Sequence, residues 1–216
     1  MDKIHKLLDL LEKHYGDTGW WPGETRDEIV IGAILTQNTS WKNVEKALSN
    51  LKQADAITLN RLAKLNETEI AALIRPSGFY NQKAKRLKSI SEAITRKYGS
   101  VDYMKGRPLD EVSAFLKEQN GIGQETLDSI LNYALDFPVF VVDKYTLRII
   151  ERFGIENEGV KDLKEAVLKY YGGDVKRIKN AHGMIVFLGK DYCKTKPICS
   201  LCPLREECDF ALRRNS

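Results

Sequence analysis

The stretch GIGQET, residues 121–126, decides how the chain is interpreted. Apolar periodicity predicts a helix over 109–118 before it and another over 124–135 after it, so its glycines form a tight turn between two helices. A nucleotide-binding loop would need a preceding strand or a Gly-Lys-Ser/Thr sequence, and neither is present. Glycines let a phosphate approach the backbone N–H groups that open the second helix. The turn therefore predicts either a helical hairpin that holds a nucleic-acid phosphate or an ordinary connection between helices.

The rest of the chain is also helical in pattern. Apolar residues recur at helical spacing over 3–15, 28–35, 67–73, 81–97, 143–152, 160–170 and 174–188. Ser40 is placed to cap a helix that continues to Leu51. The apolar VFVV, residues 139–142, has no partner strand, so we interpret it as the start of a helix. The predicted fold class is all-α.

Composition narrows the function classes only slightly. The 216 residues are 43% hydrophobic and 30% charged, which is a globular composition, and the net charge of +4 is mildly basic. Positive residues gather at 81–88, 174–180 and 194–196. No apolar run approaches the roughly 20 residues that span a bilayer, and the N-terminal stretch alternates charge with leucine, unlike a signal peptide. We expect a cytoplasmic protein with no membrane partner.

All four cysteines lie close together near the end of the sequence. Their spacing is Cys193-x5-Cys199-x2-Cys202-x5-Cys208. Soft thiolates crowded in this way suit an iron–sulfur cluster or zinc, and the presence of only one CxxC favours the larger 4Fe–4S cluster. Zinc and a site with no metal remain alternatives. Between the first two cysteines, the KTK segment at 194–196 is either a solvated loop tip or a set of cations for a phosphate backbone.

Three further segments carry a family resemblance. GFYNQKAKRL (78–87), VDKYTLRI (142–149) and MIVFLGKDYC (184–193), together with the glycine turn and the four cysteines, resemble the endonuclease III superfamily of DNA glycosylases. The resemblance covers nearly the whole chain. It implies a helix–hairpin–helix at about 109–135, a catalytic Asp143 and a 4Fe–4S cluster on the cysteines.

The resemblance also implies a domain organisation. A helical barrel would span 24–136, and a second helical domain would combine 1–23 with 137–216 and carry the cluster loop at 193–208. DNA would lie in the cleft between the two domains. The expected partner is double-stranded DNA that contains damaged bases, bound by a monomer associated with the nucleoid.

One departure bears on the reaction. Where the lyase branch of the superfamily carries a nucleophilic lysine two residues after the second hairpin glycine, this chain has Glu125. A carboxylate cannot form a Schiff base with a sugar aldehyde. Asp143 alone can stabilise the positive sugar that forms when a glycosidic bond breaks. Because an alkylated purine such as 3-methyladenine is a good leaving group, the sequence points to a monofunctional glycosylase for such bases.

Early aromatic residues suggest where the damaged base binds. WWP (20–22) and TQNTSW (36–41) are similar to the 3-methyladenine DNA glycosylase III branch, whose best-known members lack the cysteine cluster. Aromatic faces attract a flat cation, although tryptophans that simply pack in a core are equally common. The residues implied for the base pocket are Trp20, Trp21, Pro22, Trp41 and Glu125.

The same resemblance implies a set of DNA contacts. Phe79 would be the apolar wedge, and Gln37 or Asn38 the polar plug, that fill the space of a flipped base. Lys83 follows an expected helix start and would contact phosphate, with a solvated basic face as the alternative. The remaining residues implied to bind DNA are Gly121, Gly123 and Gln124 of the hairpin and Lys194 and Lys196 of the cluster loop. No role is assigned to the three histidines.

Other functions remain open at this point. An endonuclease III-type glycosylase with lyase activity would need another lysine, such as Lys144, in place of the missing one. A mismatch glycosylase for uracil or thymine also uses an aspartate without the hairpin lysine. Outside the enzymes, the chain could be a DNA-binding iron–sulfur protein in which Asp143 only caps its helix.

Overall fold

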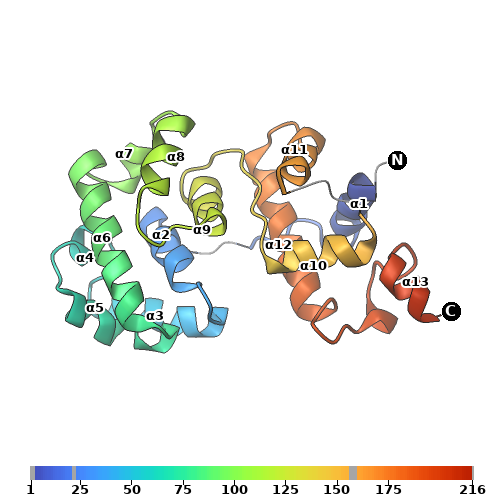
Figure 1. Ribbon diagram of the computed structural model, residues 1–216, viewed down its shortest axis with the longest axis horizontal. Helices are drawn as coiled ribbons and strands as arrows, with labels where there is room; N and C mark the ends of the chain where they lie inside the picture. The colour runs from blue at the N-terminus through green and yellow to red at the C-terminus, as the bar shows by residue number, and fades with distance from the viewer. Residues whose placement is uncertain (1–2, 21–22, 156–159, 216) are drawn as a thin grey trace. The chain divides into compact units, whose positions relative to one another are not determined.

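A computed structural model describes residues 3–20, 23–155 and 160–215 of the chain. Within these ranges all regular structure is helical and no strand occurs, which confirms the predicted all-α class. The chain divides into two units, Pro22–Phe137 and Met1–Trp21 with Pro138–Ser216. Figure 1 shows α2 to α9 in one unit and α1 with α10 to α13 in the other. One unit is therefore continuous in sequence, and the other is built from two separated segments.

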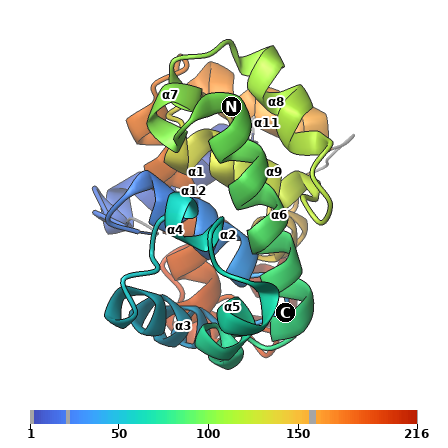
Figure 2. The same ribbon diagram turned by 90° about the vertical axis from the view of Figure 1, so that its left-hand side faces the viewer.

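The continuous unit is organised around its longest helix. It contains α2 (Arg26–Leu35), α3 (Trp41–Gln53), α4 (Leu59–Leu62), α5 (Glu67–Leu73), η1 (Arg75–Ser77), α6 (Tyr80–Tyr98), α7 (Val101–Lys105), α8 (Leu109–Lys117), α9 (Gln124–Ser129) and the π-helix η2 (Ile130–Ala134). Helix α6 contacts α2, α4, α5 and α7, and Figure 2 shows this unit facing the viewer. Its buried residues, which include Leu87, Ile90 and Ile94, are spaced three or four positions apart and so lie on one face of the helix.

Helix α2 is the buried helix of the same unit. Seven of its ten residues are buried, as the apolar run at 28–35 predicts. Thr25 caps it by accepting a hydrogen bond from the Glu28 N–H at 3.1 Å. At the start of the helix, Arg26 pairs with Asp102 at 3.0 Å and with Asp136 at 3.1 Å. These ion pairs fix the beginning of α2 against α7 and against the end of the hairpin's second helix.

The discontinuous unit packs helices from both parts of the sequence around one core. Its elements are α1 (Lys3–Tyr15), α10 (Lys144–Phe153), α11 (Val160–Tyr170), α12 (Val175–Asp191), η3 (Cys199–Leu201) and α13 (Asp209–Asn215). Helix α12 contacts both α1 and α10. The apolar stripe of α1 expected from the sequence, which consists of Ile4, Leu7, Leu8 and Leu11, is buried in this core.

Two local expectations were wrong. Residues 139–142 are not helical, and helix α10 begins only at Lys144. Asp143 is the N-cap in extended conformation, with its side chain accepting from the Thr146 N–H, and this cap sets the start of the helix at Lys144. Ser40 occupies the N-cap position of α3, but its side chain accepts no capping hydrogen bond. The short helices α4, α7 and α13 were not anticipated, because four to seven residues carry little periodic signal.

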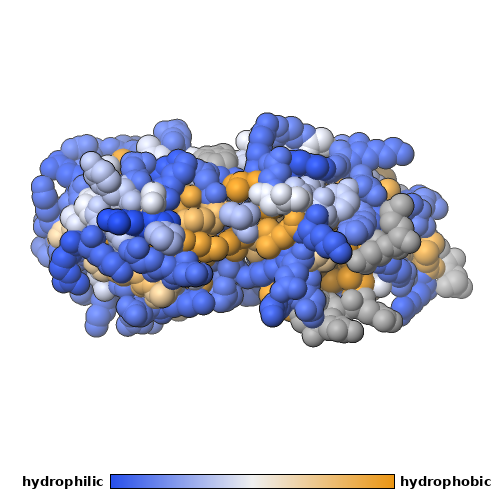
Figure 3. Space-filling model, turned by 90° about the horizontal axis from the view of Figure 1, so that it is seen from above, coloured by the Kyte–Doolittle hydropathy of each residue, from blue (hydrophilic) through white to orange (hydrophobic). Residues whose placement is uncertain are grey.

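Hydrophilic residues cover most of the face drawn in Figure 3, with apolar side chains between them. Among the helices in the described ranges, none is long and apolar enough to cross a bilayer.

Candidate nucleic-acid interface and active site

The hairpin turn lies between α8 and α9 with its glycines at the surface. Gln119 ends the first helix, since its side chain donates to the Phe115 carbonyl at 2.8 Å and its N–H donates to Leu116. Gly121 has a φ of 84°, a backbone conformation that a residue with a Cβ rarely adopts. Gly123 and the first residues of α9 are exposed, and Gly123 provides no side-chain cap for this helix. The turn thus presents the N-terminus of a helix to solvent, where an anion could bind.

Glu125 lies in the first turn of α9 and is exposed. The sequence of this helix, QETLDS, contains no lysine. Gln124 is also exposed, and its amide donates to Asp128 at 2.8 Å. The position that a hairpin nucleophile would occupy therefore carries a solvent-facing carboxylate, which cannot form a Schiff base.

Two loops of the same unit expose residues in left-handed backbone conformation. Asn38 has a φ of 55° and is exposed in the loop between α2 and α3. Phe79, the N-cap residue of α6, has a φ of 46° and a 67% exposed side chain. Such conformations cost about 1–3 kcal/mol for residues other than glycine and concentrate at functional sites. Phe79 is notable for combining an exposed ring with left-handed backbone.

Gln37 differs from its exposed neighbour. Its amide nitrogen donates to the Gly121 carbonyl at 2.9 Å and to the Thr126 hydroxyl at 3.0 Å. Its amide oxygen accepts from Arg86 at 2.5 Å. Gln37 is thereby bonded to α6, to the hairpin turn and to α9.

The structure corrects the expectation for Lys83. Its side chain is 1% exposed, and its ammonium donates to the Leu35 carbonyl at 2.8 Å and to the Ser77 carbonyl at 2.6 Å. Burial, and secondarily repulsion from Arg86, lowers the pKa of Lys83 to about 8. Lys83 therefore joins the end of α2 to the end of η1 and does not contact phosphate. Sequence alone could not separate it from the exposed Lys85 two residues later.

The residues expected to form a base pocket are distributed over both units. Trp41 is the first residue of α3 and is half-buried, and it shares its unit with Glu125. Trp20 belongs to the other unit. Trp21 and Pro22 lie outside the described residues.

Asp143 is the N-cap residue of α10 and is largely buried. One carboxylate oxygen accepts from the Thr146 N–H at 2.8 Å and from the Thr146 hydroxyl at 2.9 Å. The other lies 3.6 Å from Nε2 of His182, which is an ion-pair distance but long for a hydrogen bond. Burial raises the pKa of Asp143, but interaction with His182 and the hydrogen bonds from Thr146 outweigh it and lower the pKa below its usual value. The geometry therefore favours an ionised carboxylate in a poorly solvated site.

His182 was overlooked in the sequence, yet it links Asp143 to Trp20. It lies on α12 and is 6% exposed, and its ring centre is 5.8 Å from that of Trp20 in an edge-on arrangement. Asn180 on the same helix accepts from the Thr18 N–H at 2.9 Å and from its hydroxyl at 2.7 Å, which fixes the segment before Trp20. Asp143 and His182 are 39 residues apart, and no sequence spacing relates them.

The four cysteines of the loop at 193–208 are half-buried free thiols that interact electrostatically. Burial, with a smaller contribution from the other three thiols, raises the pKa of the Cys202 thiol to about 11, although a hydrogen bond from the Leu204 backbone to its sulfur lowers it. Among the residues that the structure describes, no three His, Cys, Asp or Glu side chains form a set for a single metal ion. Four thiols within mutual electrostatic reach, with hydrogen bonds to sulfur, nevertheless match the donor chemistry of an iron–sulfur cluster.

Arg152 of α10 braces the cysteine loop. Its guanidinium donates to the Cys193 sulfur at 3.4 Å and to the Lys194 and Thr195 carbonyls at 2.6 and 3.1 Å. The side chains of Lys194 and Lys196 remain exposed. The loop is thus held to the helix that Asp143 caps, with its two lysines at the surface.

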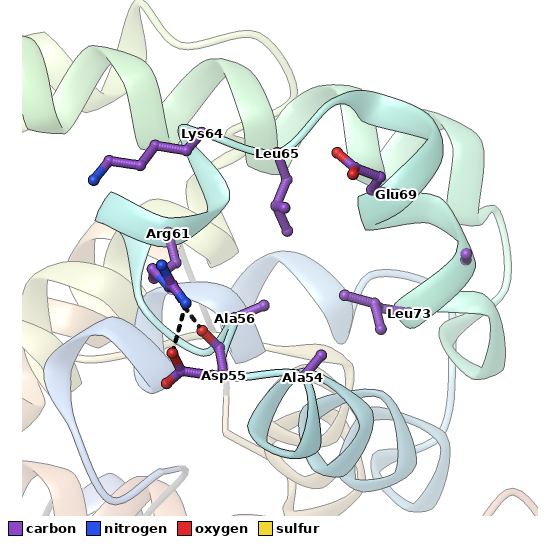
Figure 4. A pocket seen from close by; sticks show the side chains of 9 residues that line it. Ala54, Asp55, Ala56, Arg61, Lys64, Leu65, Glu69 and Leu73 are labelled. Carbon is purple, nitrogen blue, oxygen red and sulfur yellow. Dashed lines mark hydrogen bonds and ion pairs between the residues drawn. The ribbon is translucent and has the colours of Figure 1, made fainter.

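One pocket lies apart from these residues. It has a volume of about 410 Å³ and is lined by residues that follow α3 and by residues of α4 and α5, with an ion pair of 2.7 Å between Arg61 and Asp55 at its side (Figure 4). None of the residues predicted for catalysis or DNA binding lines it.

Comparison with known proteins adds independent findings. The model of the "HhH-GPD superfamily base excision DNA repair protein" family matches residues 31–171. A Methanocaldococcus jannaschii protein, provisionally named a DNA repair glycosylase, is 45% identical over 96% of both chains. Endonuclease III of Thermotoga maritima is 32% identical over 86% of this chain and 84% of its own. A solved H. pylori 3-methyladenine DNA glycosylase bound to 1,N6-ethenoadenine is 34% identical over 88% of this chain and 98% of its own, with a TM-score of 0.72.

Proposed function

Because the chain belongs to the HhH-GPD superfamily of base excision DNA repair proteins, we propose that it is a monofunctional DNA glycosylase that removes alkylated purines such as 3-methyladenine. The observation that carries the proposal is Glu125, an exposed carboxylate in a hairpin helix that contains no lysine. The similarity to the H. pylori 3-methyladenine glycosylase supports the substrate class. The protein would act as a monomer on damaged double-stranded DNA.

Asp143 would be the catalytic residue. When the bond between base and sugar breaks, positive charge develops on the deoxyribose and a fixed carboxylate nearby stabilises it; water then bonds to the sugar carbon in place of the base and releases a proton. Thr146 holds one oxygen of Asp143, so the other oxygen is directed by its 3.6 Å approach to His182. The lowered pKa keeps the carboxylate ionised at neutral pH. An alkylated purine carries its own positive charge and leaves without a general acid, so no second acid is required.

The base would be flipped out of the duplex and bound by aromatic side chains. Trp20 lies beside His182, which in turn lies beside Asp143; Trp21, Pro22 and Trp41 are assigned to the pocket by the family resemblance. A cationic base gains about 0.5–2 kcal/mol from each aromatic face it contacts. Phe79 would act as the wedge, because its ring is exposed and available for insertion between bases.

The hairpin would hold the DNA backbone. Backbone N–H groups at Gly123 and Gln124, at the exposed start of α9, provide donors for one phosphate. Lys194 and Lys196 on the cysteine loop would add sequence-independent contacts. Cys193, Cys199, Cys202 and Cys208 would hold a 4Fe–4S cluster, which would stiffen the loop that carries these lysines.

Base release from methylated duplex DNA tests the proposal. Wild type should free 3-methyladenine and leave the strands intact until heat or base is added. The Asp143→Asn variant, which retains a capping side chain, should bind the same DNA without releasing the base. Spontaneous strand cleavage, with borohydride trapping of the protein on DNA, would instead identify a lyase, with the exposed Lys144 as the first residue to test.

The other outcomes separate the remaining alternatives. Release of uracil or thymine from mismatched duplexes, without release of alkylated bases, would identify a mismatch glycosylase. Binding without release from any of these substrates would identify a DNA-binding protein. In that case Asp143→Asn would leave DNA binding unchanged.

A further inference from the structure

Both the nitrogen and the oxygen of the Gln37 side-chain amide form hydrogen bonds inside the protein. Both N–H groups are donated, one to the Gly121 carbonyl and one to the Thr126 hydroxyl, and the oxygen accepts from Arg86. A primary amide has two N–H donors, so none is left for a base. The side chain is also half-buried, whereas the next residue, Asn38, is exposed. These two neighbours therefore have different roles.

Arg86 and Gly121 complete the same contact. The Arg86 side chain passes so close to the Gly121 α-carbon that an added Cβ would overlap its Nε and Cδ atoms. With its φ of 84°, Gly121 is suited to this approach on two grounds, backbone conformation and space. The hairpin turn therefore contacts the Arg86 side chain from α6 and the Gln37 amide from the loop after α2.

The loop that carries Gln37 is itself fixed at both ends. The Thr36 hydroxyl donates to the Gly32 carbonyl at 2.7 Å. The Asn43 amide donates to the Thr39 hydroxyl at 3.2 Å. The side-chain amide of Gln37 therefore couples this loop to the hairpin turn, because it bonds the Gly121 carbonyl.

We propose that Gln37 and Arg86 form a clamp that positions the hairpin turn relative to the loop bearing Asn38. The clamp makes the phosphate-binding turn and the exposed tip of that loop move as one body, and it leaves Asn38 to contact the DNA. Gln37 and Arg86 are positioning residues, since they act through the hairpin. The inference rests on the proposed DNA-binding function of the hairpin.

The first test needs no DNA. Hydrogen exchange of the hairpin amides, residues 119–124, would be measured in wild type, Gln37→Leu, Gln37→Glu and Asn38→Ala. Gln37→Leu preserves bulk without hydrogen bonds, and Gln37→Glu keeps the Arg86 contact but cannot donate to Gly121. Both remove the neutral hydrogen bond to Gly121, worth about 1 kcal/mol, and should speed exchange roughly fivefold, whereas Asn38→Ala should leave it unchanged. Unchanged exchange in both Gln37 variants would overturn the proposal.

The second test separates positioning from direct contact. Gln37→Leu should weaken DNA binding and lower the dependence of the logarithm of affinity on the logarithm of salt concentration by about one, as expected when one phosphate contact is lost. Asn38→Ala should instead slow base release and leave that salt dependence unchanged. If Gln37→Leu behaves like Asn38→Ala in both measurements, Gln37 is the plug and the clamp is refuted.

Further variants control for folding and for the proposed function. Asn50→Ala removes an amide hydrogen bond to the Leu73 carbonyl, which belongs to neither the Gln37 loop nor the hairpin, so hairpin exchange should stay at the wild-type rate. Arg86→Met combined with Gln37→Leu should be no worse than either alone, because both remove one shared contact; fully additive effects would contradict the clamp. If wild type releases no alkylated base, the proposed function fails, but the exchange experiment still decides whether the clamp exists.

Discussion

Replacing Lys83 by methionine tests the buried ammonium that the sequence suggested was a DNA contact. Methionine has a similar length and no charge, so packing is retained while the Leu35 and Ser77 carbonyls lose their donor. Lys85→Met is the matched control, because it makes the same substitution at an exposed position of the same helix.

Two opposing contributions set the expected change in stability. Losing two hydrogen bonds from a charged donor costs about 3–6 kcal/mol, at about 1.5–3 kcal/mol each. Burial and the neighbouring Arg86 lower the pKa of Lys83 from 10.5 to about 8, which corresponds to roughly 3.4 kcal/mol of unfavourable burial that methionine does not carry. At pH 7 the variant should therefore be about 0–3 kcal/mol less stable than wild type.

The dependence on pH is the sharper part of this prediction. Between pH 8 and pH 10.5 the unfolded wild type binds the Lys83 proton and the folded state does not, so wild-type stability rises with pH in this range. Methionine cannot titrate, so the difference between the two proteins should be about 2 kcal/mol larger at pH 9.5 than at pH 7. Urea unfolding at the two pH values gives this difference directly.

The control defines what would refute the reasoning. Lys85→Met should change the free energy of unfolding by less than about 0.5 kcal/mol at either pH. A difference between wild type and Lys83→Met that stays constant or shrinks as pH rises would refute the buried-ammonium interpretation. A lower salt dependence of DNA binding in Lys83→Met, without loss of stability, would instead support the interpretation of Lys83 as a phosphate contact.

Four other perturbations have defined outcomes. Asp143→Asn should slow base release by roughly 10²–10³ with unchanged DNA affinity in a gel-shift assay; parallel loss of both would mean that Asp143 acts in binding. Because folding lowers the pKa of Asp143, its stabilising effect should be present above about pH 4 and disappear as the pH falls through the folded-state pKa. The acid unfolding curves of wild type and Asp143→Asn should therefore differ above that pH range and converge below it. Phe79→Ala should leave the melting temperature unchanged and slow release from duplex DNA; a large drop in melting temperature would identify a packing role. Cys199→Ser should reduce iron content and visible absorption, whereas a colourless, fully active wild type would exclude the cluster.

The glycine turn and the helical periodicity were enough to predict the fold class and most helix positions. The spacing of apolar residues within each segment was sufficient for these helices, because each long helix has its own apolar face. The sequence did not predict that residues 139–142 run as non-helical backbone, since an apolar stretch of four residues is compatible with helix, strand or loop. The side-chain cap at Asp143 sets the start of the helix at Lys144.

The candidate site was predictable by residue type but not by contact. Asp143 and Glu125 were identifiable from their positions next to recognisable motifs. His182 was not, because its meaning depends on α12 packing beside α10 and bringing it near Asp143. Lys83 and Lys85 have the same sequence signal, and only the rotation of α6 decides which one is buried.

The division of the chain also has a consequence for its biosynthesis. The unit containing the hairpin is continuous, so it can fold as soon as its last helix has left the ribosome. The other unit needs residues on both sides of that insertion, and the apolar stripe of α1, translated early, must wait for α10 and α12. During this interval α1 exposes leucines that a chaperone could shield. The cysteines emerge later still, so any cofactor would be inserted only after most of the polypeptide had been made.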